Sequence, residues 1–285
     1  MPNHVIVSTL GWSQRTLEEA IAGIAALDFG QADLGMVEGW AHLHPSALAD
    51  GGRERVGREA DRIRSLLARH QMRRVSAFRV GLGAPALEEQ KRRLAAVCDL
   101  AAALEVPVIA IEAAPRGTPL ADEVERLRAH VPVAAERGVQ LTVRTHVNQI
   151  TEEPAAAARL CESVPGLGLT LGAGHYYAGP NRGADFSAVL PYVRHVHLRD
   201  AGPDWEHIQV PAGTGQVDFG WIVSALHAEG YQGKFAIEYI DALPVVAPAG
   251  EPVDIPANIL RMRDVFVAKE RAAGIVRTPP APAPG

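Results

Sequence analysis

The chain of 285 residues has little cysteine, no long apolar run and no large excess of either charge. Its two cysteines, Cys98 and Cys161, lie in helix-like stretches, so a disulfide framework is not expected and a reducing compartment is favoured. No stretch reaches the roughly 18 consecutive apolar residues of a membrane span. The amino terminus lacks the basic segment and the longer apolar segment of a signal peptide. These absences predict a cytoplasmic protein.

The charge balance also argues against some partners. A net charge of −5 and a pI near 6.1 give no electrostatic reason to expect binding to nucleic acid or to an acidic membrane. With 47% hydrophobic and 21% charged residues, the composition is that of an ordinary soluble globular protein. We therefore expect a small-molecule substrate as the partner, and a homodimer remains open.

Short apolar stretches typical of strands alternate with longer amphipathic stretches typical of helices. Eight such alternations predict an α/β fold, a single-domain (β/α)8 TIM barrel over residues 1–275. The Pro- and Ala-rich residues 276–285 cannot build a core and are expected to form a disordered tail. The expected strands are 4–10, 31–37, 73–80, 106–112, 138–145, 167–171, 193–198 and 234–238, and the expected helices are 16–27, 53–70, 85–104, 120–137, 153–163, 185–190, 219–229 and 256–273.

Three segments do not fit this alternation. Residues 39–52, 174–183 and 201–216 each follow an expected strand, which makes them long loops at one end of the barrel. Long loops in that position are usually functional. The proline-rich segment 242–252, after the last expected strand, could form the edge of a lid.

The most informative stretch is the sequence HVHLRD at residues 195–200. Two histidines and an arginine alternate there with apolar residues, so on a strand the polar side chains leave one face and the apolar ones the other. A second apolar stretch ends in a glutamate. Polar groups at the carboxyl ends of strands are where a TIM barrel carries its chemistry. The polar residues concerned are His195, His197, Arg199 and Glu238.

Five segments carry a resemblance: HVHLRD at 195–200, GTGQVDF at 213–219, GYQG at 230–233, IEY at 237–239 and GLTLGAGH at 168–175. They are similar to segments of the sugar phosphate isomerase/epimerase family, the xylose-isomerase-like TIM barrels. That family holds one divalent ion with Glu, Asp, His and Glu at the ends of four successive strands. It uses the two glutamates as acid and base for proton transfer next to a carbonyl. The resemblance assigns His197 to the family's histidine and Glu238 to its last glutamate.

Two of the four ligand positions of the family differ here. Its first glutamate corresponds to Arg144 and its aspartate to Gly172. Divalent hard ions need oxygen ligands, and a guanidinium at a ligand position repels the ion. Two outcomes remain open, and we favour the second. In the first, a rebuilt site binds zinc, manganese or a similar ion through His146, His175, His197 and Glu238. In the second, no metal is bound, and Arg144 stabilises an oxyanion or clamps a carboxylate.

Further polar candidates lie on the same end of the expected barrel. Glu112 is either another acid or base or the ion-pair partner of an interior arginine. Asp33 could bind substrate hydroxyl groups, or could pair with an arginine such as Arg79. His195 and Arg199 are candidate substrate ligands, although His195 could equally be an interior histidine that is hydrogen-bonded to its neighbours.

Aromatic and loop residues give weaker signals. Trp12 and Trp40 could stack on a substrate ring or could pack the loops. His42 could reach the site or could be solvated. The Gly-Thr-Gly sequence at 213–215 could expose amides to a phosphate, or could simply form a turn.

These features predict an isomerase, epimerase or lyase-type enzyme that acts on a sugar, cyclitol or related oxo compound by proton transfer next to a carbonyl. Glu238 and either His175 or His146 are the expected proton carriers, and Arg144 is the expected stabiliser of the enolate oxygen. The alternative is a barrel that has lost catalysis and binds a small anionic ligand through Arg144 and the histidines.

Overall fold

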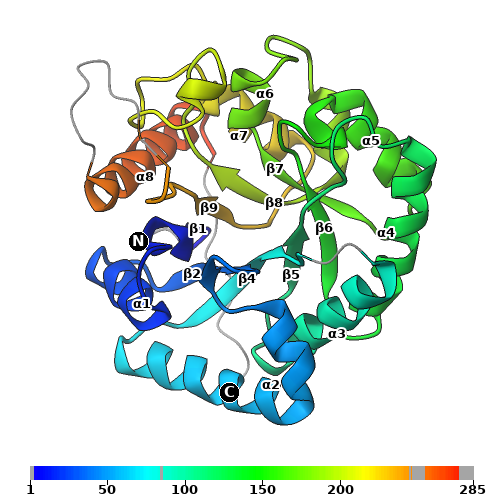
Figure 1. Cartoon of the computed structure of the whole chain (residues 1–285). Coiled ribbons are helices and arrows are strands. Elements are labelled where there is room, and N and C mark those ends of the chain that lie inside the picture. Colours follow the sequence, from blue (N-terminus) through cyan, green and yellow to red (C-terminus); the bar gives the residue numbers. More distant parts are fainter. Residues whose placement is uncertain (1–2, 84–85, 244, 246–253, 276–285) are drawn as a thin grey trace.

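The computed structural model describes residues 3–83, 86–243, 245 and 254–275. Eight parallel strands follow the order β1-β9-β8-β7-β6-β5-β4-β2, and β1 also pairs with β2, so the sheet closes on itself. This closed ring inside a layer of helices (Figure 1) confirms the predicted single-domain TIM barrel. The strands are β1 (Val5–Ser8), β2 (Gln31–Val37), β4 (Arg74–Gly81), β5 (Val108–Ile111), β6 (Gln140–Arg144), β7 (Gly168–Gly172), β8 (Val193–Leu198) and β9 (Phe235–Ile237).

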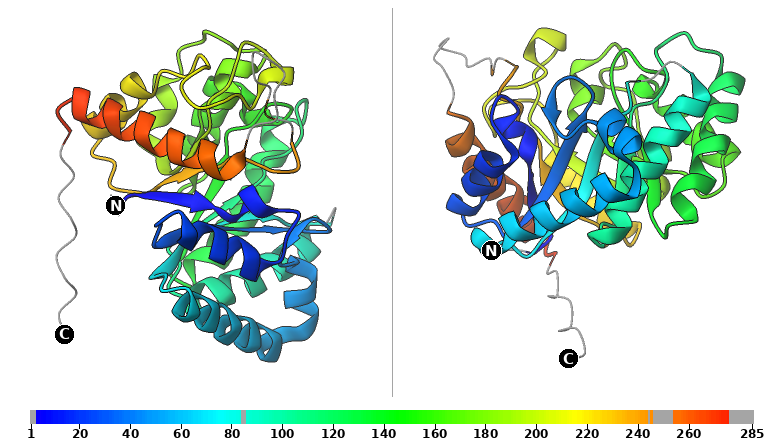
Figure 2. Two further views of the ribbon diagram at one scale, coloured as in Figure 1. Left: turned by 90° about the vertical axis from the view of Figure 1, so that its left-hand side faces the viewer. Right: turned by 60° about the horizontal axis from the view of Figure 1, so that its bottom comes forward.

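Helices form the outer layer, which Figure 2 shows from two further sides. The first begins at a capping box, in which the Thr16 hydroxyl and the Glu19 carboxylate each accept a hydrogen bond from the other residue's amide. Within the described part of the chain, no helix has the length and apolar content needed to cross a membrane. The α-helices are α1 (Leu17–Ala26), α2 (Pro45–Arg69), α3 (Leu87–Ala103), α4 (Leu120–Ala135), α5 (Pro154–Ser163), α6 (Gly174–Ala178), α7 (Phe219–Ala228) and α8 (Ile255–Ala272), and the 3-10 helices are η1 (Thr9–Trp12), η2 (Ile150–Glu152), η3 (Ser187–Tyr192) and η4 (Trp205–His207).

The first of the expected loops contains regular structure. Strand β3 (Ala41–His42) pairs antiparallel with the end of β2, and α2 begins at Pro45 rather than at Arg53. The early start has a local cause, because Glu38 accepts hydrogen bonds from the Ser46 amide at 2.9 Å and from its hydroxyl at 2.5 Å. A carboxylate on the first free amides of a helix stabilises that end.

The other loop expectations have mixed outcomes. Residues 174–178 form α6, whereas the expected helix at 185–190 is the 3-10 helix η3. Residues 201–216 are irregular apart from η4. The expected lid segment 242–252 and the expected tail 276–285 fall mainly or wholly outside the described residues.

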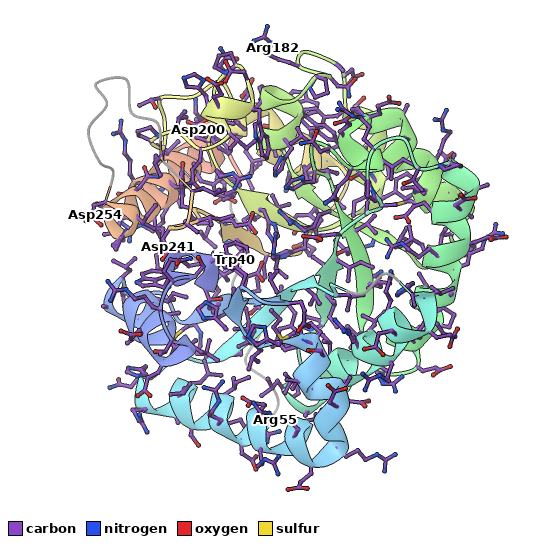
Figure 3. The ribbon with its side chains drawn as sticks, in the orientation of Figure 1. Trp40, Arg55, Arg182, Asp200, Asp241 and Asp254 are labelled. Atoms are coloured by element: carbon purple, nitrogen blue, oxygen red, sulfur yellow. The ribbon has the colours of Figure 1, made fainter. Side chains whose placement is uncertain are left out.

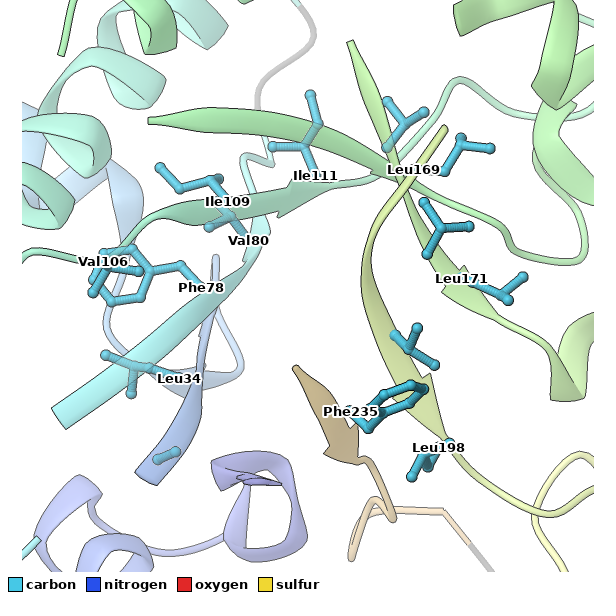
Figure 4. Packing of buried hydrophobic residues seen from close by; sticks show 14 of the residues in the cluster. Leu34, Phe78, Val80, Val106, Ile109, Ile111, Leu169, Leu171, Leu198 and Phe235 are labelled. Carbon is cyan, nitrogen blue, oxygen red and sulfur yellow. The ribbon is translucent and has the colours of Figure 1, made fainter. Parts of the chain in front are cut away.

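Alternation along the strands separates an apolar layer from a polar barrel interior. Side chains of one parity point outward and are buried under the helices (Figure 4). Side chains of the other parity line the interior, where the hydroxyls of Thr142 and Thr170 share a hydrogen bond of 2.7 Å. Polar groups at the strand ends therefore face a common space. The outward residues labelled in Figure 4 include Leu34, Phe78, Ile109, Leu169 and Phe235.

Helix α2 is kinked at Gly52, which has φ 57° and ψ −155°. Only glycine adopts this conformation readily, so Gly52→Ala should lower the free energy of unfolding by about 1–3 kcal/mol. Gly57 lies in the same helix with helical backbone angles, and Gly57→Ala should instead raise it by about 0.5–1 kcal/mol. A Cβ at either position meets nothing within 4 Å, so packing does not confuse the comparison. Urea denaturation measures both changes, and equal effects would contradict the strain argument.

Candidate functional site

Glu238, directly after β9, lies at the centre of a buried polar cluster. Its Oε1 lies 3.3 Å from His197 Nδ1 and 3.8 Å from Arg79 Nε, and its Oε2 lies 3.5 Å from Arg144 Nη2. All four side chains are buried. Burial alone raises the pKa of the Glu238 carboxyl, but nearby positive charge, from the His197 ring when it is protonated and from the guanidinium groups of Arg144 and Arg79, lowers it to about 2. Glu238 is therefore a carboxylate at neutral pH.

Asp33, on β2, pairs with two histidines rather than with an arginine. Its Oδ2 accepts hydrogen bonds from His195 Nε2 at 3.0 Å and from His197 Nε2 at 2.9 Å. Burial raises the pKa of Asp33, but these two hydrogen bonds outweigh it and hold the pKa well below its usual range. An ionised carboxylate can only accept, so both rings carry hydrogen on Nε2.

This hydrogen position has a consequence for the contact between His197 and Glu238. Burial lowers the pKa of His197, although Glu238 and Asp33 act in the opposite direction, so the neutral ring keeps its single hydrogen on Nε2. His197 Nδ1 is then a lone pair that faces Glu238 Oε1 at 3.3 Å. Among the described residues neither atom has a hydrogen-bond partner. Two buried acceptors in this position are complementary to a hydrogen of a bound group.

A second group of rings lies nearby. Arg199 Nη2 donates to His175 Nε2 at 2.9 Å, which places the hydrogen of this ring on Nδ1. His146 donates from Nδ1 to the Val147 carbonyl at 2.6 Å, which leaves its Nε2 as an acceptor. The two imidazole rings lie 4.0 Å apart, and the Trp205 ring lies 6.2 and 6.4 Å from them. Burial is the main reason why the pKa of His146 falls to about 3 and that of His175 well below its usual value, so both are neutral at pH 7.

Trp40 and Glu112 flank the arginine side of this cluster. The Trp40 ring lies 5.7 Å from Arg79 Cζ, a distance typical of a cation–π contact. Figure 3 shows Trp40 near the centre of the ring of strands, whereas Arg55 and Arg182 lie at the periphery. Glu112 Oε1 lies 3.7 Å from Arg79 Nη2, and its side chain is 47% exposed. The contact of Glu112 is thus with an interior arginine.

Two candidates make contacts away from the cluster. The indole of Trp12 packs against Gly23 of α1. The contact is so close that a Cβ atom at this glycine would lie only 2.5 Å from the ring. His42 Nε2 lies 3.0 Å from the Thr9 carbonyl oxygen, and the His42 ring is half-buried. Neither contact supports the predicted substrate-binding role. The Trp12 contact fits the alternative in which this residue packs the loops, whereas the half-buried His42 is not the solvated histidine of its alternative.

Asp200 organises the loop at 201–216 and was not singled out from the sequence. Its Oδ2 accepts hydrogen bonds from the amides of Gly213 at 2.8 Å and Gly215 at 3.0 Å, and its Oδ1 from that of Ala201 at 3.0 Å. The Gly-Thr-Gly sequence is therefore a turn bound to a carboxylate, which supports the turn and not the phosphate site of the two alternatives. The available signal was an aspartate that ends the HVHLRD sequence shortly before that turn.

Trp205 was also missed, because only tryptophans directly after the first two strands were considered. It lies on η4 in the middle of a long loop and is 48% exposed, although it lies beside the buried His175 and the half-buried His146. Sequence spacing does not fix where the tip of such a loop lies.

The family model of the xylose isomerase-like TIM barrels matches residues 25–263. The chain belongs to this family. No curated protein matches it.

Solved structures of xylose isomerase-like TIM barrels are similar to the whole chain. A family protein from Mycobacterium smegmatis in complex with magnesium is 16% identical, with 94% of this chain and 97% of that chain covered and a TM-score of 0.72. D-Allulose 3-epimerase from Methylomonas sp. is 17% identical, with 93% and 97% covered and a TM-score of 0.69. The probable 3-DHS dehydratase involved in petrobactin synthesis from Bacillus anthracis is 15% identical, with 92% and 98% covered and a TM-score of 0.66. At these identities the likeness shows the fold alone.

The residues at the family's ligand positions do not fit a divalent ion. Arg144 places a guanidinium 3.5 Å from the Glu238 carboxylate. At Gly172, even a Cβ would lie 3.1 Å from His175 Cδ2 and 3.2 Å from the Thr145 carbonyl oxygen, so there is little room for a carboxylate. Two of the four positions that the resemblance assigns to metal ligands thus offer a fixed positive charge and a glycine with close neighbours instead of carboxylates.

The rebuilt set of His146, His175, His197 and Glu238 also meets an obstacle, because His175 Nε2 is already occupied by Arg199. Among the described residues, the group with ligand atoms close enough to hold an ion is Asp33, His195 and His197, all within 4.8 Å of one another. This group could hold a metal ion, but two hydrogen bonds already join its three residues.

The Asp33 pair predicts a pH dependence of stability. The pKa of Asp33 is depressed in the folded chain, so its ionised carboxylate stabilises the fold. This stabilisation is fully present above the ordinary pKa of about 3.9 and is lost as the pH falls below that value. Asp33→Asn should lower the free energy of unfolding by about 2–4 kcal/mol at pH 7. Between about pH 5 and pH 3, the free energy of unfolding of this variant should also fall less steeply than that of the unmodified protein. Urea denaturation across this range measures both effects.

The matched control is Asp122→Asn on the exposed face of α4, which should change the free energy of unfolding by no more than about 0.5 kcal/mol. An acid decline in Asp33→Asn as steep as that of the unmodified protein would show that another carboxyl group causes it.

Proposed function

We propose that this protein is an isomerase, epimerase or dehydratase-like lyase that moves a proton next to a carbonyl group of a small oxygenated molecule, a sugar, cyclitol or related oxo compound. The observation that carries the proposal is the pair of buried acceptors, His197 Nδ1 and Glu238 Oε1, 3.3 Å apart and beside the guanidinium of Arg144. A proton acceptor next to a fixed positive charge is what removal of a proton beside a carbonyl requires.

Glu238 and Arg144 have complementary roles in this proposal. The C–H bond breaks, its proton goes to Glu238, and its electron pair forms the enolate, whose oxygen accepts hydrogen bonds from the Arg144 guanidinium. Return of a proton to the opposite face of the same carbon gives an epimer. If that carbon carries a hydroxyl group, transfer of the hydroxyl proton to the enolate oxygen and return of the abstracted proton to the former carbonyl carbon give an isomer. If the next carbon carries a hydroxyl group, the enolate re-forms the carbonyl, the C–O bond breaks, and the departing hydroxyl takes the proton from Glu238 and leaves as water, which gives a dehydrated product. None of these steps uses a metal ion.

A pKa of about 2 makes Glu238 a weak base before substrate binds. A base works best when its pKa lies near the working pH. The guanidinium charges of Arg144 and Arg79 contribute to the low pKa, so a substrate oxygen that hydrogen-bonds to them offsets their effect on Glu238. Substrate binding itself would therefore raise the basicity of Glu238.

The second proton carrier is His146 or His175. With its Nδ1 hydrogen held by the Val147 carbonyl, His146 offers an acceptor at Nε2. His175 offers a donor at Nδ1, which has no partner among the described residues. The two stacked rings thus present one acceptor and one donor, which suits a substrate hydroxyl group.

The alternative is a barrel without catalytic activity that binds a small anion. It is supported by the same buried guanidinium groups. Glu238→Gln separates the two functions, since an enzyme would lose its rate of proton exchange, whereas a binding protein has no such rate to lose and would keep its ligand affinity. The cytoplasmic location and the homodimer remain predictions.

Glu238→Gln should lower the rate of proton exchange by about 10²–10⁴-fold, because an amide cannot accept the proton. Deuterium uptake in heavy water at the carbon next to the carbonyl, followed by NMR over a panel of ketoses and oxo acids, measures the rate. Glu125→Gln, on the exposed face of α4, should leave it unchanged. A substrate that exchanges equally fast with the Glu238→Gln variant would refute the proposed base.

Removal of metal should not abolish this exchange. We expect protein dialysed against EDTA to keep its activity, and elemental analysis to find well below one ion per chain. If activity is lost and returns with added magnesium, manganese or zinc, the metal-free mechanism is wrong. His195→Ala would then show whether Asp33, His195 and His197 hold that ion.

A further inference from the structure

We propose that Arg79, Arg144 and Arg199 bind a carboxylate group of the substrate, which makes the substrate an oxo acid rather than a neutral sugar. The inference rests on the function proposed above, since it takes the anion to be part of the molecule whose proton Glu238 removes.

The first argument is that these arginines keep buried donors without partners. Their exposed fractions are 6%, 3% and 5% for Arg79, Arg144 and Arg199. Among the described residues, no partner is found for Nε and Nη1 of Arg79, Nη1 of Arg144 or Nε of Arg199. A buried donor left without a partner is unfavourable, and more so when it is charged. Four such atoms, on three arginines whose charges all act on Glu238, indicate that the partner is a bound molecule.

The neighbouring carboxylates do not meet this need. Glu238 lies 3.5 Å from Arg144 Nη2 and 3.8 Å from Arg79 Nε, and Glu112 lies 3.7 Å from Arg79 Nη2. Hydrogen bonds between guanidinium and carboxylate groups are usually about 2.7–2.9 Å long. The guanidinium groups therefore lie near negative charge without forming the close two-pronged pairs that arginine makes with a carboxylate.

The second argument is mutual repulsion. Burial lowers the pKa of Arg79 to about 10 and also lowers the pKa of Arg199, and the positive charge of Arg144 adds to both effects. Three like charges in one buried cluster oppose one another, and an anion bound among them relieves the repulsion. The cluster is thus built to favour a negatively charged ligand.

A carboxylate suits this cluster better than a phosphate does. The guanidinium fork matches either group. However, the Glu238 carboxylate already lies within 3.8 Å of two of the arginines. A phosphate ester brings a charge of about −1.5 to −2 beside it, whereas a carboxylate brings one unit. In a 2-oxo acid the carboxylate is attached to the reacting carbonyl carbon. Its oxygens and the carbonyl oxygen could then accept hydrogen bonds from neighbouring guanidinium groups at the same time.

The test compares two probes that differ only in this group, pyruvate and its neutral amide, pyruvamide. Their dissociation constants, measured by NMR titration of the whole chain at fixed ionic strength, should differ at least tenfold in favour of pyruvate. Arg79→Gln and Arg199→Gln should each weaken pyruvate binding about tenfold and leave pyruvamide unchanged. Arg58→Gln, on α2 with a side chain 58% exposed, is the matched control and should change neither.

Equal affinity of the unmodified protein for the two probes would overturn the inference, and this comparison needs no variant to fold. Tighter binding of inorganic phosphate than of pyruvate would overturn the choice of carboxylate. Glu238→Gln separates the inference from the proposed function, because it should keep the preference for pyruvate while it loses proton exchange. If Glu238→Gln retains both proton exchange and the preference for pyruvate over pyruvamide, Glu238 is not the base, whereas the carboxylate site is still supported.

Discussion

The pairing of β1 with both β2 and β9 is the constraint on which the site depends. It closes the sheet, so the inward side chains of all eight strands share one narrow interior. Residues as far apart in the chain as Asp33 and His197 become hydrogen-bond partners for this reason. The same alternation that places polar groups inside places apolar side chains under the helices, so the core and the site have one structural origin.

Several buried donors and acceptors in this interior form no hydrogen bond with one another or with any other described residue. The donors without partners among the described residues belong to arginines and to His175, and the acceptors without partners are Asp33 Oδ1, His197 Nδ1 and Glu238 Oε1. A molecule with an oxygen-rich end and an acidic C–H or O–H group would satisfy both sets. This polarity limits the chemistry of the ligand more strongly than membership of the family does, since the three similar structures named above are only 15–17% identical to the chain.

Most of the fold could be predicted from the sequence, because short apolar stretches alternate regularly with amphipathic ones. In β8 the polarity also alternates from residue to residue, and His195 and His197 are buried on the interior side, as predicted. Contacts across the barrel could not be predicted, since parity gives the direction of a side chain but not its partner. The two roles predicted for Asp33, binding of substrate hydroxyl groups or pairing with an arginine, therefore did not include the two histidines that it binds. The early start of α2 was missed because its cap comes from Glu38, which precedes the helix in an irregular segment.

The crowding at Gly172 makes the departure from the usual ligand set difficult to reverse. A glutamate in place of Arg144 would return one carboxylate, but an aspartate at position 172 would press on the His175 ring, which Arg199 holds through a hydrogen bond. Restoring both carboxylates would therefore require a shift of the His175 ring, and with it of the Arg199 side chain, in addition to the two substitutions.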